Sequence, residues 1–90
     1  MDTKFQTYFL EIAKQKNLSK AAERLFVGQS TLSQFIAREE NQLGIKLFSR
    51  KDGKLELTYA GKLYAKTWSE ILESQNALFR KISEVKQSQA

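Results

Sequence analysis

A helical pattern runs without interruption through the last third of the chain and limits what the remainder can form. Mostly apolar side chains recur there at spacings of three and four residues, which is typical of a coiled-coil seam. Thr58 is a suitable N-cap, so the sequence predicts one helix from about Tyr59 to Ser88, roughly 45 Å long. A chain of 90 residues cannot wrap so long a helix, and we expect its outer half to expose an apolar stripe unless a partner covers it. The seam comprises Tyr64, Trp68, Ile71, Gln75, Leu78, Ile82 and Val85.

Two helices are expected before residue 26. The first should end near Lys16-Asn17, with Asn17 as a left-handed stop. Ser19 is a strong N-cap for a second helix of about two turns, because its side-chain oxygen can satisfy an orphan backbone N–H. That helix should break at Phe26-Val27-Gly28. The buried stripe of the first helix comprises Phe5, Tyr8, Phe9 and Ile12.

A third helix is predicted from Gln29 to Gln42, with Gly28 as its N-cap and Gly44 as its C-terminal stop. A short helix, a tight break and a longer helix together form a helix-turn-helix.

Residues 45–57 should form a two-stranded hairpin, or wing. Asp52-Gly53 is a strong turn pair, and it is flanked by the alternating apolar residues Ile45, Leu47, Leu55 and Leu57. The predicted fold class is therefore mainly α. A winged helix-turn-helix of three helices and a β-hairpin occupies residues 1–58, and a long linker or dimerisation helix occupies residues 59–90.

Composition argues against several functions. The chain has no cysteine and no histidine, which removes disulfides, thiolate zinc sites and the commonest general base. The helical acids form no catalytic pair, so we expect no enzyme activity, metal or cofactor. No stretch is apolar enough to span a membrane and Met1-Asp2-Thr3-Lys4-Phe5 begins no secretory signal, so we expect a cytoplasmic protein. The acids expected to be surface charges are Glu11, Glu23, Glu39 and Glu40.

The predicted third helix has two different faces. Leu32, Ile36 and Leu43 point toward the core, whereas the opposite face is polar and free of acids. An α-helix fits the major groove, where glutamine and serine side chains bond base edges. Its N-terminal residues also lie where the helix dipole favours a phosphate. The alternative is a plain solvated surface. The outward residues are Ser30, Ser33, Gln34, Ala37 and Asn41, and the N-terminal ones are Gln29, Ser30 and Thr31.

The wing favours a nucleic-acid partner. The net charge of +5 suits a polyanion, and Arg50, Lys51 and Lys54 gather near the hairpin tip. Such a tip can hold phosphates and reach a minor groove. The alternative is a solubilising run of charge. Between residues 46 and 66 the basic residues are Lys46, Arg50, Lys51, Lys54, Lys62 and Lys66, against Asp52 and Glu56.

The order of these motifs resembles the DNA-binding domain of the LysR-type transcriptional regulators. The stretch from Ser19 to Ser33 is similar to their helix-turn-helix. The similarity spans nearly the whole chain, from Phe5 to the final helix. It continues through Ile36, Glu40, Leu43-Gly44-Ile45, Leu47-Phe48-Ser49-Arg50 and Leu57-Thr58-Tyr59-Ala60-Gly61.

The resemblance implies a protein that binds double-stranded DNA at interrupted inverted repeats as a homodimer or a tetramer, paired through the linker helix. It implies that Gln29, Ser30, Ser33 and Gln34 face bases and that Arg50 holds the backbone or minor groove. The full set of expected DNA contacts is Ser19, Gln29, Ser30, Thr31, Ser33, Gln34, Arg38, Arg50, Lys51 and Lys54. The expected dimer contacts are Tyr64, Trp68, Ile71, Leu72, Leu78 and Ile82.

Members of this family continue into a domain that senses a small-molecule effector. We therefore expect the chain to be a fragment cut at the linker or a naturally short form.

Three residues depart from the family pattern. Ser30 replaces a common proline, which lowers rigidity at the helix start but adds a hydrogen-bonding group. Phe35 replaces a common glutamine, and we expect it to be half-exposed or to meet a thymine methyl. Glu39 replaces an apolar residue, and because a buried unpaired carboxylate is costly, we expect it at the rim of the core or beside a basic group.

A second hypothesis is a winged-helix protein-interaction module that docks through its long helix, since a fold does not by itself fix a function. Salt dependence separates the two, because phosphate binding weakens steeply as salt rises. An enzyme is the least supported class.

Overall fold

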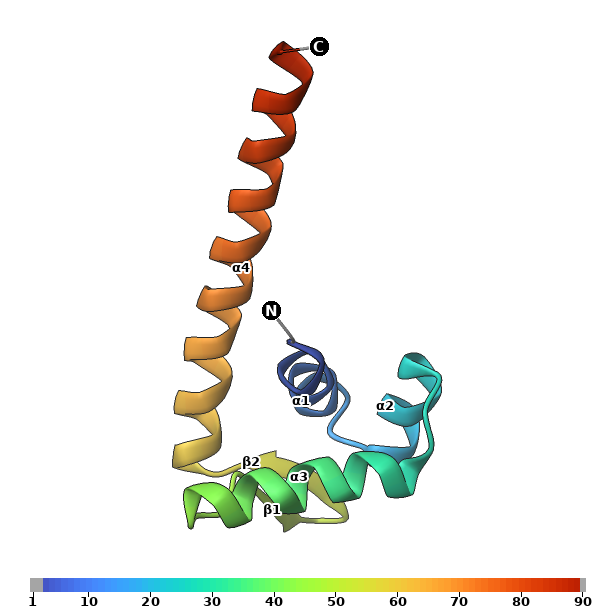
Figure 1. Ribbon diagram of the computed structural model, residues 1–90. Helices are drawn as coiled ribbons and strands as arrows, with labels where there is room; N and C mark the ends of the chain where they lie inside the picture. Colours follow the sequence, from blue (N-terminus) through green and yellow to red (C-terminus); the bar gives the residue numbers. More distant parts are fainter. Residues whose placement is uncertain (1–2, 90) are drawn as a thin grey trace.

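The computed structural model describes residues 3–89. A compact body contains three helices and a hairpin, and α4 leaves it as a long arm (Figure 1). The molecule measures 54 × 26 × 22 Å. No helix within the described residues is long and apolar enough to cross a membrane. The elements are α1 (Lys4–Gln15), α2 (Leu18–Leu25), α3 (Gln29–Leu43), β1 (Phe48–Lys51), β2 (Lys54–Leu57) and α4 (Tyr59–Ser88), which confirms the predicted fold class.

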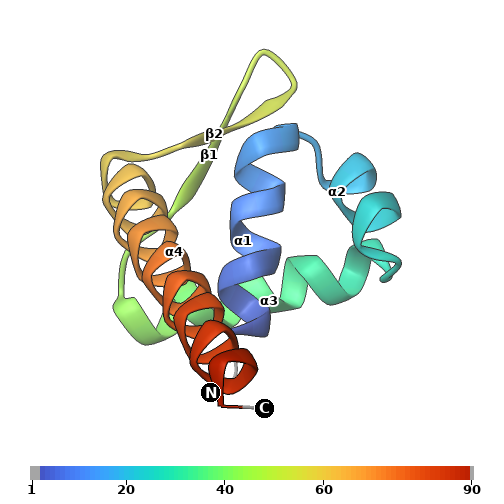
Figure 2. The same cartoon turned by 90° about the horizontal axis from the view of Figure 1, so that it is seen from above.

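The core forms around α1, which lies between the other helices of the body and the base of α4 (Figure 2). The ring centroid of Phe9 lies 5.0 Å from that of Phe48 and 4.6 Å from that of Tyr64. One buried ring of α1 therefore holds both the first residue of the wing and the base of α4. The buried core residues are Phe9, Ile12, Ala21, Ala22, Leu32, Leu47 and Phe48.

The connection between α1 and α2 differs from the prediction. Lys16, not Asn17, adopts the left-handed conformation that ends α1, with φ 56°. Asn17 is instead the N-cap of α2, and its Oδ1 accepts a hydrogen bond from the backbone N–H of Lys20 at 2.9 Å. The predictions of Asn17 as a stop and Ser19 as an N-cap are therefore wrong. Asparagine is as good an N-cap as serine. With Asn17 in that role, α2 begins at Leu18, so Ser19 lies inside the first turn of the helix.

The predicted break and the third helix are confirmed. Phe26 is left-handed with φ 58°, and α3 begins after the extended Gly28 and ends at Gly44 with φ 72°. Within α3, Leu32 is buried and Ile36 half-buried, but Leu43 is exposed. The prediction that Leu43 faces the core is wrong, because the last turn of α3 extends past α1 (Figure 2).

The wing is a shorter hairpin than predicted. Phe48 pairs with Leu57 and Arg50 with Leu55. Asp52 and Gly53 both have positive φ, as a type I′ turn requires. β1 does not begin at residue 45. Ile45 is 55% exposed, and the backbone of Leu47 bonds to Glu40 and Thr58 rather than to β2.

The base of α4 is fixed to the segment that leads into the wing. Thr58 Oγ1 accepts a hydrogen bond from Gly61 N at 3.0 Å, which confirms the predicted cap, and donates to the carbonyl of Lys46 at 2.7 Å. A Cβ on Gly61 would lie only 2.0 Å from the carbonyl oxygen of Leu47. Only glycine permits this approach, which sets where the arm leaves the body.

Candidate nucleic-acid interface

The outer face of α3 is exposed and polar. Every residue predicted to point outward is exposed, and so are the predicted contacts Gln29, Thr31 and Arg38. The guanidinium carbon of Arg38 lies 6.0 Å from the ring centroid of Phe35, which steadies the side chain at the edge of this face. The confirmed outward residues are Ser30, Ser33, Gln34, Ala37 and Asn41.

One acid of α3 is turned inward and holds the wing. Glu40 is only 8% exposed, and its Oε2 accepts hydrogen bonds from the backbone N–H groups of Leu47 at 2.7 Å and Phe48 at 3.2 Å. Lys46 Nζ lies 3.6 Å from Oε1. The prediction that Glu40 is a surface charge is wrong, because these donors compensate the buried carboxylate. Glu40 thereby fixes the start of β1 against α3.

The second acid of α3 holds the arm. Glu39 is half-buried at the rim of the core, as expected, but the group it pairs with is the Tyr64 hydroxyl, which donates to its Oε2 at 2.8 Å. Burial, together with the hydrogen bond to Glu39 and its negative charge, raises the pKa of Tyr64 above its usual value. The outer face of α3 is free of acids because both carboxylates of this helix are engaged elsewhere.

Of the two other acids predicted to be surface charges, one is exposed and one is half-buried. Glu23 is exposed as expected, whereas Glu11 is half-buried, with its Oε2 3.5 Å from Arg24 Nε.

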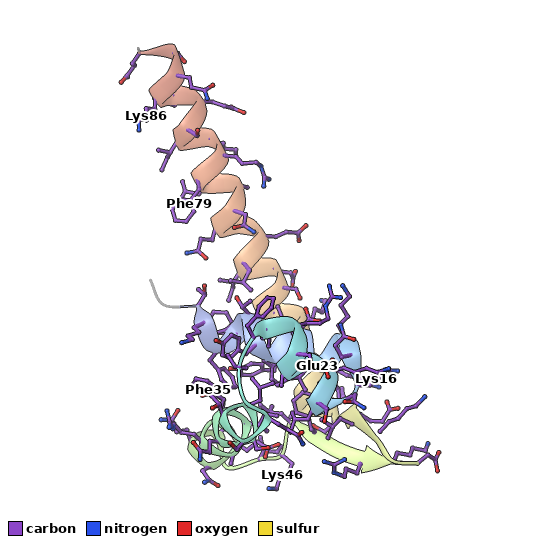
Figure 3. The ribbon with its side chains drawn as sticks, turned by 90° about the vertical axis from the view of Figure 1, so that its right-hand side faces the viewer. Lys16, Glu23, Phe35, Lys46, Phe79 and Lys86 are labelled. Carbon is purple, nitrogen blue, oxygen red and sulfur yellow. The ribbon has the colours of Figure 1, made fainter. Side chains whose placement is uncertain are left out.

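Phe35 packs against α1. Its ring centroid lies 5.9 Å from that of Phe5 and 5.4 Å from that of Tyr8, and the side chain lies between α1 and α3 (Figure 3). The residue is half-buried, in agreement with one of the two expectations. This position does not favour the other, a contact with a thymine methyl.

The basic residues of the wing are divided between its two faces. Arg50 pairs with Leu55 and lines a groove between α3 and the wing, together with Ser33 and Ala37. Lys51 and Lys54 pair with each other on the opposite face and line a separate hollow. The fold thus brings Arg50 to the outer face of α3 and separates it from the two lysines with which the sequence grouped it.

Two lysines that the sequence did not single out as contacts also lie beside this surface. Lys16 lines a polar hollow with Ser19, Gln29 and Arg50, and its carbonyl accepts a hydrogen bond from Leu55 N at 3.1 Å. Lys46 lies between α3 and the wing (Figure 3). Lys16 is more than 30 residues from the wing in sequence, so only the tertiary contact places it there.

The predicted dimer residues fall into two groups. Tyr64 and Trp68 lie at the base of α4, half-buried, with ring centroids 6.3 Å apart, and Leu72 is also half-buried. The remainder belong to an apolar surface that we call the outer stripe, which includes Phe79, a residue the heptad pattern missed. Phe79 projects clear of the body (Figure 3). The outer stripe comprises Ile71, Leu78, Phe79, Ile82 and Val85, all exposed.

These features define a winged helix-turn-helix protein with an extended C-terminal helix. Residues 6–62 match the family model described as bacterial regulatory helix-turn-helix protein, lysR family, and the chain belongs to this family.

Known relatives are longer proteins. The chain is 38% identical over 84 residues to the uncharacterized HTH-type transcriptional regulator YcgK of Bacillus subtilis, an alignment that covers 93% of this chain and 26% of YcgK. Among solved structures, the Vibrio fischeri DarR complex with DNA superposes with a TM-score of 0.83 at 36% identity, covering 97% of this chain and 30% of DarR. The CbnR_DBD–DNA complex gives a TM-score of 0.83 at 28% identity, covering 94% and 98%.

Proposed function

We propose that this chain reads the sequence of double-stranded DNA for a bacterial transcription regulator. In this proposal residues 1–58 bind DNA and residues 59–90 pair two copies, although residues 1, 2 and 90 lie outside the described structure. α3 enters the major groove, and the wing contacts the backbone or the minor groove. We further propose a cytoplasmic protein without enzyme activity.

One observation carries the proposal. Ser33 and Ala37, two residues of the acid-free outer face of α3, line one groove together with Arg50 of the wing. Short polar side chains let a helix approach base edges closely, and an arginine beside them can neutralise a phosphate. We assign base contacts to Gln29, Ser30, Ser33 and Gln34, and close backbone contacts to Thr31, Arg38 and Arg50. Lys51 and Lys54, on the other face of the hairpin, are assigned weaker, longer-range contacts with the backbone. Ser19 is assigned to the interface through its hydrogen bond to Gln29. Two of the similar solved structures are complexes with DNA, which supports DNA as the partner.

The arm supports a homodimer. The five large apolar side chains of the outer stripe are exposed in the single chain. Apolar stripes along one side of a helix are typical of helices that pair with another helix. Two recognition helices related by a two-fold axis would bind an inverted repeat. Contacts are assigned to Tyr64, Trp68, Ile71, Leu72, Leu78 and Ile82, with the half-buried aromatic pair contributing least.

The proposal is tested by selection from a pool of random DNA duplexes, followed by sequencing of the bound fraction. Two half-sites in inverted repeat are the expected enrichment, and their spacing reports the dimer geometry. Uniform retention would mean backbone binding without sequence reading. No retention at low salt would reject DNA binding.

The exposed outer stripe is also the observation that favours the alternative, a protein-interaction module. A salt titration distinguishes the two functions. Binding through phosphates falls steeply as salt rises because counterions are released, whereas docking through apolar side chains does not.

A further inference from the structure

One hydrogen bond joins the side chains of the two helices of the helix-turn-helix. The hydroxyl of Ser19, near the start of α2, donates to Oε1 of Gln29, the first residue of α3, at 2.8 Å. Both side chains are exposed, and both line the polar hollow that also contains Arg50. The pair therefore lies at the end of the surface that faces DNA in the proposed function.

The backbone does not require this hydroxyl. The side chain of Asn17 already caps α2 by accepting from Lys20 N, so Ser19 Oγ is not needed by a helix terminus. Gln29 likewise caps nothing, because Gly28 is the N-cap of α3. The geometry leaves the Ser19 hydroxyl one identifiable role, which is to orient the amide of Gln29.

An oriented amide reads DNA differently from a free one. A glutamine side chain has one acceptor oxygen and an amino group with two donor hydrogens. A free glutamine can bond adenine with both groups at once, the oxygen accepting from N6 and the nitrogen donating to N7. When Ser19 holds the oxygen on the protein side, the outward group is the Nε2 donor.

We infer that Ser19 is a positioning residue that makes Gln29 a hydrogen-bond donor to the major groove. The matching bases carry acceptors there: guanine through O6 and N7, and thymine through O4, whereas adenine offers only N7 beside its N6 donor. Cytosine presents its N4 amino group, so donor would meet donor and that base is disfavoured. The inference rests on the proposed function, because it specifies how one of its base-reading side chains is set.

The test is a double-mutant cycle in base preference. The unmodified protein and the variants Ser19→Ala, Gln29→Ala and Ser19→Ala/Gln29→Ala are each selected against the same random duplex pool. Ser19→Thr, which keeps the hydroxyl, is the matched control. Urea unfolding of each variant verifies that the fold is retained.

We expect Gln29→Ala to abolish discrimination at one base pair of each half-site. Ser19→Ala should change the preference at that same base pair only, lowering the advantage of guanine or thymine over adenine about fivefold, the effect of one ordinary hydrogen bond. Ser19→Ala should have no further effect once Gln29 is alanine, and Ser19→Thr should keep the original profile.

Three results would overturn the inference. Ser19→Ala could weaken binding to every sequence equally, by a factor that multiplies the factor measured for Gln29→Ala. In that case the two residues act independently and Ser19 contacts DNA directly. If the unmodified protein enriches an inverted repeat and Ser19→Ala leaves its profile unchanged, Ser19 does not position Gln29, although the proposed function stands. If the unmodified protein enriches no sequence, the proposed function fails and this inference fails with it.

Discussion

The compact body and the outer half of α4 use their apolar side chains in opposite ways. Phe9 is fully buried among rings from its own chain, whereas Phe79 is 57% exposed and projects away from the body (Figure 3). The body therefore obtains its stability within one chain. The arm gains little from its own apolar residues until a second surface covers them. The position of an aromatic residue thus determines whether it contributes to folding or to association.

The largest expected effect is the loss of stability in Phe9→Ala, compared with the same substitution at Phe79. Phe9→Ala should lower the free energy of unfolding by about 3–5 kcal/mol, through lost burial and the cavity left behind. Phe79→Ala should change it by less than about 0.5 kcal/mol, because its ring is exposed. Urea unfolding followed by circular dichroism, at protein concentrations too low for association, measures both. Equal losses would mean that the arm folds back onto the body.

A charge in the outer stripe should act on association instead of folding. Ile82 is 54% exposed, and Ile82→Lys would bury an unpaired ammonium group in a paired stripe, once from each copy. We expect the dimer dissociation constant to rise by about a hundredfold, on the basis of about 1.4 kcal/mol from each of the two copies. Sedimentation equilibrium gives this constant. Gln87→Lys adds the same charge to α4 on the side away from the outer stripe and is the matched control. An unchanged dimer in Ile82→Lys would mean that the seam is assigned to the wrong face.

The hydrogen bond between Tyr64 and Glu39 joins the two regions and should respond to alkali. The pKa of Tyr64 is raised in the folded protein, chiefly by burial, so the folded state resists loss of this proton. Its contribution is fully present below about pH 10, the unfolded value, and is lost as the pH rises from there, by at most about 1.4 kcal/mol per unit.

Tyr64→Phe should therefore lower stability by about 1–2 kcal/mol at pH 8, since it removes a hydrogen bond to a carboxylate. The variant should also lose less stability than the unmodified protein between pH 9 and pH 11. Paired urea titrations across this range compare the two proteins, so that the other tyrosines and the lysines cancel. If the stability of the two proteins falls in parallel across this range, the pKa of Tyr64 is not raised by folding.

The features that the sequence predicted well are those decided by neighbouring residues. The glycines at both ends of α3, the Asp52-Gly53 turn and the Thr58 cap each act on their own local backbone, and each was predicted at the correct position. The acid-free face of α3 followed from helical periodicity in the same way. Local rules sufficed because these elements would adopt the same conformation with little help from the rest of the fold.

The features that the sequence missed depend on contacts between distant segments. Glu40 looks like any helical surface acid until the backbone of residues 47 and 48 arrives to donate to it. Asn17 and Ser19 are equally good caps locally, and only the path of the chain decides between them. The separation of Arg50 from Lys51 and Lys54 required the register of the hairpin, which the predicted strand from residue 45 did not supply.

The smallest expected effect tests which face of the wing contacts DNA. Arg50 lines the groove beside α3, whereas Lys51 lies on the other face of the hairpin. Arg50→Ala should weaken binding to all duplexes about equally and reduce the slope of log affinity against log salt by about one, the loss of one neutralised phosphate. Lys51→Ala changes the same formal charge and is the matched control; we expect a smaller change in slope, because its side chain points away from the groove. Fluorescence anisotropy at several salt concentrations measures both slopes, and sedimentation should find the dimer unchanged in each variant. A larger change in slope for Lys51→Ala than for Arg50→Ala would place the DNA against the opposite face of the wing, and the groove beside α3 would then not be the binding surface.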